Sequence, residues 1–177
     1  AMELGGNAPF LVLGDADIDA AVDGALLAKM RNGGQACTAA NRFYVHESIY
    51  AAFADALAER MRSLHVGPAS DASVDVGPLV NAESVSKVRE LVEDAVRRGA
   101  RVLTGGESPD GPGYFYPPTV LADVPADARI LHEEVFGPVA PLVRFSSEDE
   151  AVAAANATIY GGRDSRSPDA WNREWSP

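Results

Sequence analysis

Cysteine is almost missing from this sequence of 177 residues, which contains only Cys37. One cysteine cannot form an internal disulfide, so the sequence favours a reducing, cytoplasmic setting. Long apolar runs are missing too, because no stretch approaches the ~20 residues that cross a bilayer. The first residues do not have the pattern of a signal peptide. We therefore expect no membrane partner.

Basic residues are scarce as well. Lys and Arg number 15 against 26 Asp and Glu, which gives a formal net charge of −11, and the basic residues form no cluster. Nucleic acids and anionic membrane surfaces attract proteins through basic patches. The composition therefore argues against nucleic acid as a partner. With 46% hydrophobic and 23% charged residues, it is otherwise ordinary for a globular domain.

Short apolar runs alternate with stretches of helical periodicity, over a length that corresponds to about one domain. Strands are predicted over residues 9–13, 42–46, 101–104 and 139–145, and an extended segment over 114–120. Helices are predicted over 18–30, 48–64, 82–98 and 148–155, the first ending at a glycine turn and the second capped by Ser48. We expect the first strand to be buried and residues 67–81 to form a surface loop. The alternation predicts an α/β fold, an open, mostly parallel twisted sheet flanked by helices.

The last 16 residues, GRDSRSPDAWNREWSP, differ in character from the rest. They contain both tryptophans, two prolines and three arginines, and no aliphatic side chain larger than alanine. Such a segment cannot bury a core face. The sequence therefore predicts a domain over residues 1–161 and a divergent, irregular or disordered tail over 162–177.

Cys37 lies in the segment MRNGGQACTAANR, residues 30–42, among glycines and small polar residues. A lone cysteine is most often a small buried hydrophobic residue. A glycine-flanked loop directly after a helix suits an accessible, nucleophilic thiol better. The three histidines, His46, His65 and His132, lie in unrelated contexts, which disfavours a thiol hydrolase that uses a histidine base.

Three segments together resemble the signature motifs of the aldehyde dehydrogenase superfamily. They are ELGGNAPF at 3–10, GQACTAANR at 34–42 and EEVFGPVAP at 133–141. Their order matches the family, and so does their spacing, 34 positions from Glu3 to Cys37 and 97 from Cys37 to Glu134. The resemblance runs from residue 2 to about residue 161. It covers the catalytic domain of that family only, and this domain is incomplete at its C-terminal end.

The resemblance implies a role for each matching residue. Cys37 would attack an aldehyde carbonyl to give a thiohemiacetal, and its backbone N–H would be one oxyanion donor. Hydride would then pass to NAD or NADP, and Glu3 would activate the water that hydrolyses the resulting thioester. Because CoA-acylating members typically lack this acid, hydrolytic release is expected.

Four further residues are implied to bind the cofactor, and no metal is implied. Glu134 would bond the ribose next to the nicotinamide, and Phe136 would pack near the nicotinamide ring. The backbone of Leu4 and Gly5 would border the carboxamide. An aldehyde is the expected small-molecule partner, and full-length relatives are expected to be homo-oligomers.

Arg31 bears on the choice of aldehyde. At the end of a predicted helix it could simply complement the helix dipole. It could also bind a carboxylate at the far end of a substrate. The motifs look most like the succinate-semialdehyde dehydrogenase branch, in which the matching arginine helps to hold the substrate carboxylate. Ala39 stands where some members have a second cysteine, so a redox-switch disulfide is not expected.

No glycine-rich phosphate loop precedes the first motif. The family's cofactor domain, its second oxyanion donor and the contacts that separate NAD from NADP would lie upstream of residue 1. The alternative to an enzyme domain is therefore a catalytically inactive fragment that keeps the fold or its self-association. We expect residues 1–177 alone to show no NAD(P)-linked aldehyde oxidation.

Overall fold

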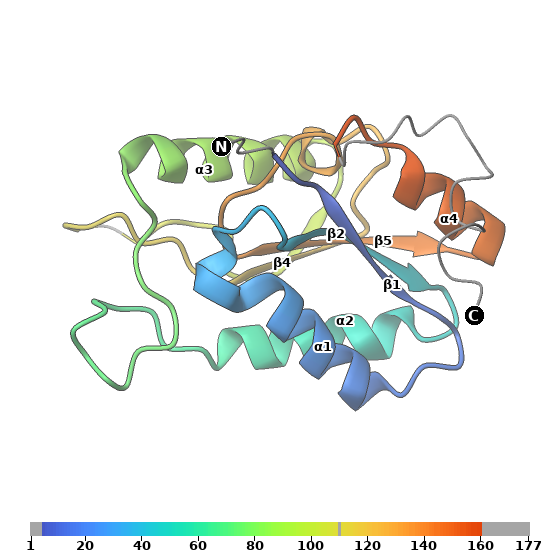
Figure 1. Ribbon diagram of the computed structural model, residues 1–177, viewed down its shortest axis with the longest axis horizontal. Helices are drawn as coiled ribbons and strands as arrows, with labels where there is room; N and C mark the ends of the chain where they lie inside the picture. The colour runs from blue at the N-terminus through green and yellow to red at the C-terminus, as the bar shows by residue number, and fades with distance from the viewer. Residues whose placement is uncertain (1–4, 110, 161–177) are drawn as a thin grey trace, which may run out of the picture.

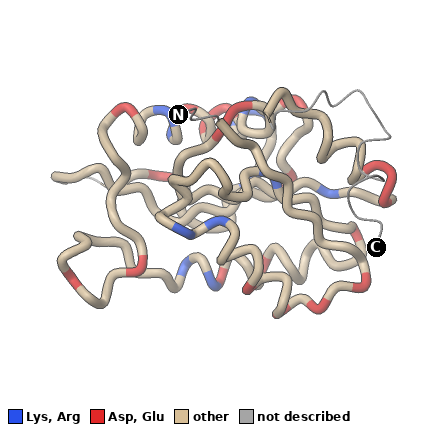
Figure 2. The backbone as a smooth tube through the Cα atoms, viewed as in Figure 1, with Lys and Arg blue, Asp and Glu red and all other residues tan. Residues whose placement is uncertain are grey.

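The computed structural model describes residues 5–109 and 111–160 (Figure 1). Glu3, Leu4 and the tail over 162–177 lie outside the described residues, so what the sequence predicts for them stays a prediction. None of the helices in the described ranges is long and apolar enough to cross a membrane. Figure 2 shows Lys and Arg scattered along this part of the chain, with Asp and Glu spread over both loops and helices.

A five-stranded sheet in the order β1-β2-β5-β4-β3 forms the middle layer of the molecule (Figure 1). The strands are β1 (Ala8–Val12), β2 (Ala40–His46), β3 (Arg101–Thr104), β4 (Thr119–Ala122) and β5 (Val139–Phe145). The pairs β1–β2, β2–β5 and β5–β4 are parallel. The outer strand β3 pairs antiparallel with β4. The prediction of an α/β fold with an open, mostly parallel sheet is confirmed.

Helices cover both faces of the sheet. Those of the described residues are α1 (Ile18–Met30), α2 (Tyr50–Arg62), α3 (Ala82–Arg97) and α4 (Glu148–Asn156). Successive side chains of a strand point to opposite faces. Accordingly, Phe43 and Val45 of β2 share a cluster with α1 and α2, whereas Tyr44 between them packs with Ala151 of α4. The amphipathic α3 packs on that second face, through a cluster that includes Val139 of β5.

The turn that ends α1 has the left-handed conformation predicted for it. The short 3-10 helix η1 (Arg31–Gly34) follows α1 directly, and φ is 53° at Asn32, 62° at Gly33 and 77° at Gly34. A Cβ atom on Gly34 would lie 2.1 Å from the carbonyl oxygen of Gly137. Glycine at position 34 therefore allows the loop before β2 to touch the loop before β5.

The first strand is not buried as predicted. Residues alternate between partly buried and exposed along β1, and only Val12 is fully buried. The reason is position, because β1 is an outer strand of the described sheet and solvent reaches one of its faces. An outer strand also tolerates Pro9, which cannot donate to a ladder.

One element boundary also differs from prediction. Helix α2 begins at Tyr50, and its N-cap is Ile49, which makes no side-chain hydrogen bond. Ser48, predicted as the cap, instead places its Oγ 2.8 Å from His46 Nδ1, within the turn that follows β2. Strand β4 begins at Thr119, inside the segment predicted to be extended, because Pro117 and Pro118 lack the N–H that a ladder requires. The loop over 67–81 is mostly exposed as predicted, although two of its side chains, Val76 and Leu79, are buried.

A buried arginine joins the two ends of the described chain. Arg42 of β2 is only 1% exposed. Its Nε and Nη2 donate to the carbonyl oxygen of Asn7 at 2.9 and 2.7 Å, just before β1. Its Nη1 and Nη2 donate to Ala154 O and Ala155 O in the last turn of α4 at 3.1 and 3.0 Å. One guanidinium therefore satisfies carbonyl groups from both segments.

Arg42→Met and Arg42→Lys should each lower the free energy of unfolding by about 2–4 kcal/mol, since buried carbonyl groups lose their donors. Lysine cannot replace the planar fork with one ammonium group. The measurement is urea unfolding. The control is Arg62→Met, whose side chain is 53% exposed, and its effect should stay within about 0.5 kcal/mol. An Arg42→Lys protein as stable as the unsubstituted chain would contradict this account.

Candidate active site

Three loops that carry the family motifs meet at one edge of the sheet. Residues 5–7 precede β1, residues 35–39 precede β2 and residues 134–138 precede β5. These three strands are adjacent and parallel, so their amino ends lie at the same edge. Ligands of open α/β sheets usually bind beyond the carboxyl ends of the strands. The candidate site therefore lies at the amino ends of these strands, opposite to the carboxyl ends that the general rule favours.

Gly6 brings the first loop into contact with the loop of Cys37. A Cβ atom on Gly6 would lie 2.0 Å from the carbonyl oxygen of Cys37, so only glycine allows this approach. Cys37 itself is exposed, as predicted for an accessible thiol. Among the contacts of the described residues, no hydrogen bond uses the backbone N–H of Cys37. That N–H is a suitable donor for an oxyanion formed at the sulfur-bound carbon.

Glu134 lies beside the same glycines. Its Oε1 accepts a hydrogen bond from the Gly6 N–H at 2.6 Å, and its own N–H donates to the Tyr160 hydroxyl at 3.4 Å. A Cβ atom on Gly5 would lie 2.8 Å from Glu134 Oε2. The structure thus brings together Gly5, Cys37 and Glu134, three of the site residues that the sequence predicts.

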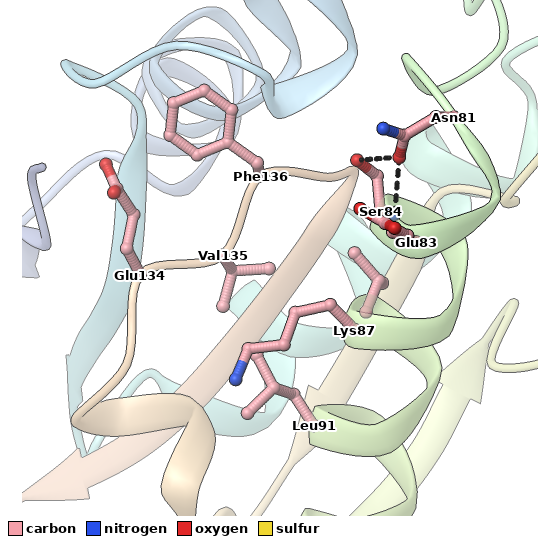
Figure 3. Close-up of a pocket in the computed structure, with 9 residues that line it drawn as sticks. Asn81, Glu83, Ser84, Lys87, Leu91, Glu134, Val135 and Phe136 are labelled. Atoms are coloured by element: carbon pink, nitrogen blue, oxygen red, sulfur yellow. Dashed lines mark hydrogen bonds between the residues drawn. The ribbon is translucent and has the colours of Figure 1, made fainter.

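A cavity of about 240 Å³ adjoins Glu134 and Phe136, and helix α3 closes its other side (Figure 3). Its polar lining includes Asn81, Ser84 and Lys87, which sequence reasoning missed. Asn81 could be recognised as a helix cap, and its Oδ1 does accept from Ser84 N–H at 2.8 Å. Nothing in the sequence indicates that this helix start faces Glu134.

Glu134 and Phe136 fit one end of a pyridine nucleotide. No hydrogen bond within the described part of the chain uses Glu134 Oε2. A free carboxylate oxygen accepts sugar hydroxyls well. Phe136 is 41% exposed, so its ring is available to pack against a flat heterocycle.

Arg31 lies on the surface, at the junction of α1 and η1. No carboxylate among residues 5–109 and 111–160 forms an ion pair with it. An unpaired guanidinium at this place suits both interpretations of the sequence, a cation at a helix C-terminus and a group that binds a substrate carboxylate.

Gln35 connects the loop of Cys37 to the end of the loop over 67–81. Its Nε2 donates to Pro78 O at 3.4 Å, and its Oε1 accepts from Val80 N–H at 3.0 Å. That loop is therefore more than a connection, because its last residues support the segment that carries Cys37.

The histidines have other partners. His46 bonds Ser48, His65 pairs with Asp75, and His132 bonds the Ala126 carbonyl oxygen. None of these contacts involves Cys37, which gives no support to a hydrolase with a histidine base. No group of three or more His, Cys, Asp or Glu side chains is placed to hold a metal ion within the described ranges.

Lys29 is a second feature that sequence reasoning missed. It is 1% exposed and comes from the last turn of α1. Its Nζ donates to Asn41 Oδ1 at 2.8 Å, and Asn41 Nδ2 donates to Gly6 O at 3.4 Å. Burial lowers the pKa of Lys29 to about 7. A fully buried lysine beside the candidate site is unusual in a globular protein.

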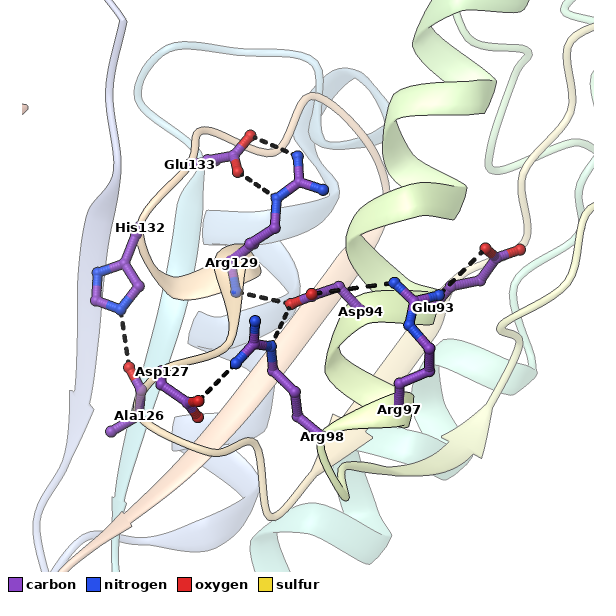
Figure 4. Close-up of polar contacts among 9 residues, drawn as sticks. All are labelled: Glu93, Asp94, Arg97, Arg98, Ala126, Asp127, Arg129, His132 and Glu133. Carbon is purple, nitrogen blue, oxygen red and sulfur yellow. Dashed lines mark hydrogen bonds and ion pairs between the residues drawn. The ribbon is translucent and has the colours of Figure 1, made fainter.

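Glu133, the neighbour of Glu134, belongs to an ion-pair network (Figure 4). Arg129 of the 3-10 helix η2 (Arg129–Leu131) donates from Nε to Glu133 Oε1 at 2.6 Å, and Lys87 of α3 pairs with Oε2. The Arg129 hydrogen bond and then the Lys87 hydrogen bond lower the pKa of Glu133 to about 2. The Arg129 N–H also donates to Asp94 of α3 at 3.0 Å. The network therefore fixes the loop of Glu134 onto α3.

Glu133→Gln should lower stability at neutral pH and have little effect in acid. The folded-state pKa lies below the ordinary value of 4.5, so the contribution is full above 4.5 and is lost as pH falls toward about 2. We expect a loss of about 1 kcal/mol near neutral pH, discounted for solvent screening. The measurement is denaturant unfolding across this range.

The control for Glu133 is Glu93→Gln, which removes an exposed ion pair with Arg97 at 3.7 Å. Its effect should be small at every pH. If the Glu133→Gln difference persisted unchanged at the acid end of the range, the ion pairs would not be its cause.

Comparisons with known proteins agree with this geometry. A model of the aldehyde dehydrogenase family matches residues 1–165. The probable succinate-semialdehyde dehydrogenase, NADP(+), of Sinorhizobium fredii is 53% identical over 161 residues, which are 91% of this chain and 33% of that protein. The 3-sulfolactaldehyde dehydrogenase of Pseudomonas putida is 52% identical with the same coverage.

A solved structure gives the same result for the fold. The crystal structure of succinate-semialdehyde dehydrogenase from Burkholderia pseudomallei is similar with a TM-score of 0.87 and 48% identity, covering 92% of this chain and 35% of that one. The chain therefore spans about a third of the length of the relatives that it matches.

Proposed function

The chain belongs to the aldehyde dehydrogenase family, and from this premise we propose that it is the catalytic part of an enzyme that oxidises an aldehyde to a carboxylic acid with NAD(P). One observation carries the proposal. Gly6 contacts the carbonyl of Cys37 and donates to Glu134 at 2.6 Å, so the three motif segments form one site. The NADP(+) in the name of the S. fredii relative supports this choice of cofactor.

Cys37 is the nucleophile of the proposed reaction. Its thiolate attacks the aldehyde carbon, a C–S bond forms, and the carbonyl electrons move to oxygen, which accepts from the Cys37 N–H. NAD(P), when bound, would supply the acceptor for the hydride that leaves this carbon. Cys37 then holds the acyl group as a thioester. Glu3 removes a proton from water, the hydroxide displaces the thiolate, and the acid leaves.

The described residues proposed to bind the cofactor lie at the same end of the strands as Cys37. Glu134 and Phe136 would hold the nicotinamide riboside end, and the backbone of Leu4 and Gly5 would border it. The free Oε2 of Glu134 and the exposed Phe136 ring support these roles.

The proposed substrate is an aldehyde with an anionic far end, succinate semialdehyde in the first place. Two relatives are named for such compounds, one with a carboxylate and one with a sulfonate. Arg31 is the group proposed to bind this anion, because its guanidinium is exposed six positions before Cys37.

An inactive fragment is the second candidate. In this candidate the 177 residues, which span about a third of the length of these relatives, keep the fold or self-association and do not turn over by themselves. The two candidates differ in whether the chain takes part in NAD(P)-linked turnover when a cofactor domain is supplied, and only the first requires a reactive Cys37.

Nucleophilic reactivity can be tested without any cofactor. The 177-residue chain should release p-nitrophenol from p-nitrophenyl acetate, because a displayed thiolate attacks an activated ester. Cys37→Ala should remove this release, and Ala36→Ser should retain it. For oxidation, residues 2–161 can replace the matching third of the S. fredii relative, and reduced nicotinamide is measured with succinate semialdehyde.

In that chimera Cys37→Ala should abolish turnover. Glu3→Gln should slow steady-state turnover about 10²–10⁴-fold, as for loss of a general base, while a first burst of reduced cofactor remains. A folded chimera that binds NADP but shows no aldehyde-dependent reduction would refute the enzyme proposal. Activity that survives Cys37→Ala would refute the role of Cys37.

Arg31→Met in the chimera should raise KM for succinate semialdehyde by about 10–100-fold, the loss expected for a charge-assisted hydrogen bond. KM for butanal, which has no carboxylate, should change little. Arg31→Lys should be intermediate because it keeps the charge without the fork. Equal changes for both aldehydes would show that Arg31 supports the helix end and not the substrate.

A further inference from the structure

The side chain of Lys29 is buried next to the end of η1, just before the loop that carries Cys37. This side chain is 1% exposed, and its Cε would lie 3.1 Å from a Cβ atom on Gly34, the last residue of η1. A methionine or leucine would fill this space without the cost of desolvating an amine. The polar end of Lys29 therefore calls for an explanation beyond packing.

That polar end fixes the orientation of a neighbouring amide. Lys29 Nζ donates to Asn41 Oδ1 at 2.8 Å. An asparagine has its acceptor and its donors on opposite sides of the amide. With Oδ1 turned toward the lysine, Nδ2 faces the carbonyl oxygen of Gly6 at 3.4 Å. Without a donor at position 29, the Asn41 amide could rotate and this contact would be lost.

The backbone of Gly6 contacts both other loops of the candidate active site. Its N–H donates to Glu134 Oε1 at 2.6 Å, and its Cα lies against the carbonyl of Cys37. A continuous series of hydrogen bonds thus runs from Lys29 through Asn41 and Gly6 to Glu134.

We propose that Lys29 is a positioning residue of the active site, which acts through Asn41 to fix the backbone of Gly6 between Cys37 and Glu134. This role rests on the proposed function, because the site around Cys37 is an active site only if the chain belongs to a working aldehyde dehydrogenase. Lys29 touches neither substrate nor cofactor in this account. Its effect is to hold the geometry of groups that do.

Amide hydrogen exchange of the full 177-residue chain tests the proposal. In Lys29→Met, the Gly6 amide should exchange about tenfold faster relative to the slowest core amides, because local opening becomes easier while the core stays closed. Alkylation of Cys37 by iodoacetamide should become about threefold faster, because the loop of Cys37 loses a fixed contact with Gly6 and moves more freely. Leu57→Ala is the control, a core truncation in α2 that lies outside the hydrogen-bond series.

Asn41→Asp shows whether the hydrogen bond from Asn41 to Gly6, and not merely the burial of Lys29, holds Gly6 in place. Aspartate still accepts from Lys29 but cannot donate to Gly6 O, so it should reproduce both effects of Lys29→Met. This variant decides the matter if Lys29→Met fails to fold. If Gly6 exchange and Cys37 alkylation change in both variants only as they do in Leu57→Ala, the proposal is overturned. These measurements use neither aldehyde nor nucleotide, so they stay decisive even if no dehydrogenase activity is found.

Discussion

The buried guanidinium of Arg42 is the interaction on which the rest of the structure depends. It pairs with no carboxylate in the described part of the chain and instead donates to three backbone carbonyl groups, those of Asn7, Ala154 and Ala155. A charge removed from water is stable only when its donors are all used. Because Asn7 directly follows Gly6, this one side chain fixes both the outer strand β1 and the first loop of the site.

The segment over 5–7 is consequently held by side chains from three directions. Arg42 bonds Asn7 O, Asn41 bonds Gly6 O, and Glu134 accepts from Gly6 N–H. Two of these side chains come from β2 and one from the loop before β5. A segment without regular secondary structure thereby gains a defined position, which a site for covalent chemistry requires.

Much of this arrangement could be predicted from the sequence. Apolar runs and helical periodicity identify the strands and helices, and Asn32-Gly33-Gly34 predicts the left-handed turn before Cys37. Position within the sheet could not be predicted, so solvent exposure of β1 was missed. The roles of Lys29, Ser84 and Lys87 were missed for a related reason. Each belongs to a helix, and periodicity indicates a buried or exposed face of a helix without naming what lies opposite, whether Asn41 twelve positions away or the loop of Glu134 further along the chain.

The adjacent acids Glu133 and Glu134 show how three-dimensional context separates residues that look alike in the sequence. Arg129 and Lys87 neutralise both oxygens of Glu133, and its pKa is lowered to about 2. Glu134 receives one backbone N–H on Oε1, and no hydrogen bond in the described part of the chain uses its Oε2. A carboxylate with both oxygens paired to cations stabilises the fold, whereas one with an oxygen that accepts no hydrogen bond can bind a ligand. The ion pairs of Glu133 therefore have a local consequence, since they anchor the loop and leave the next carboxylate available.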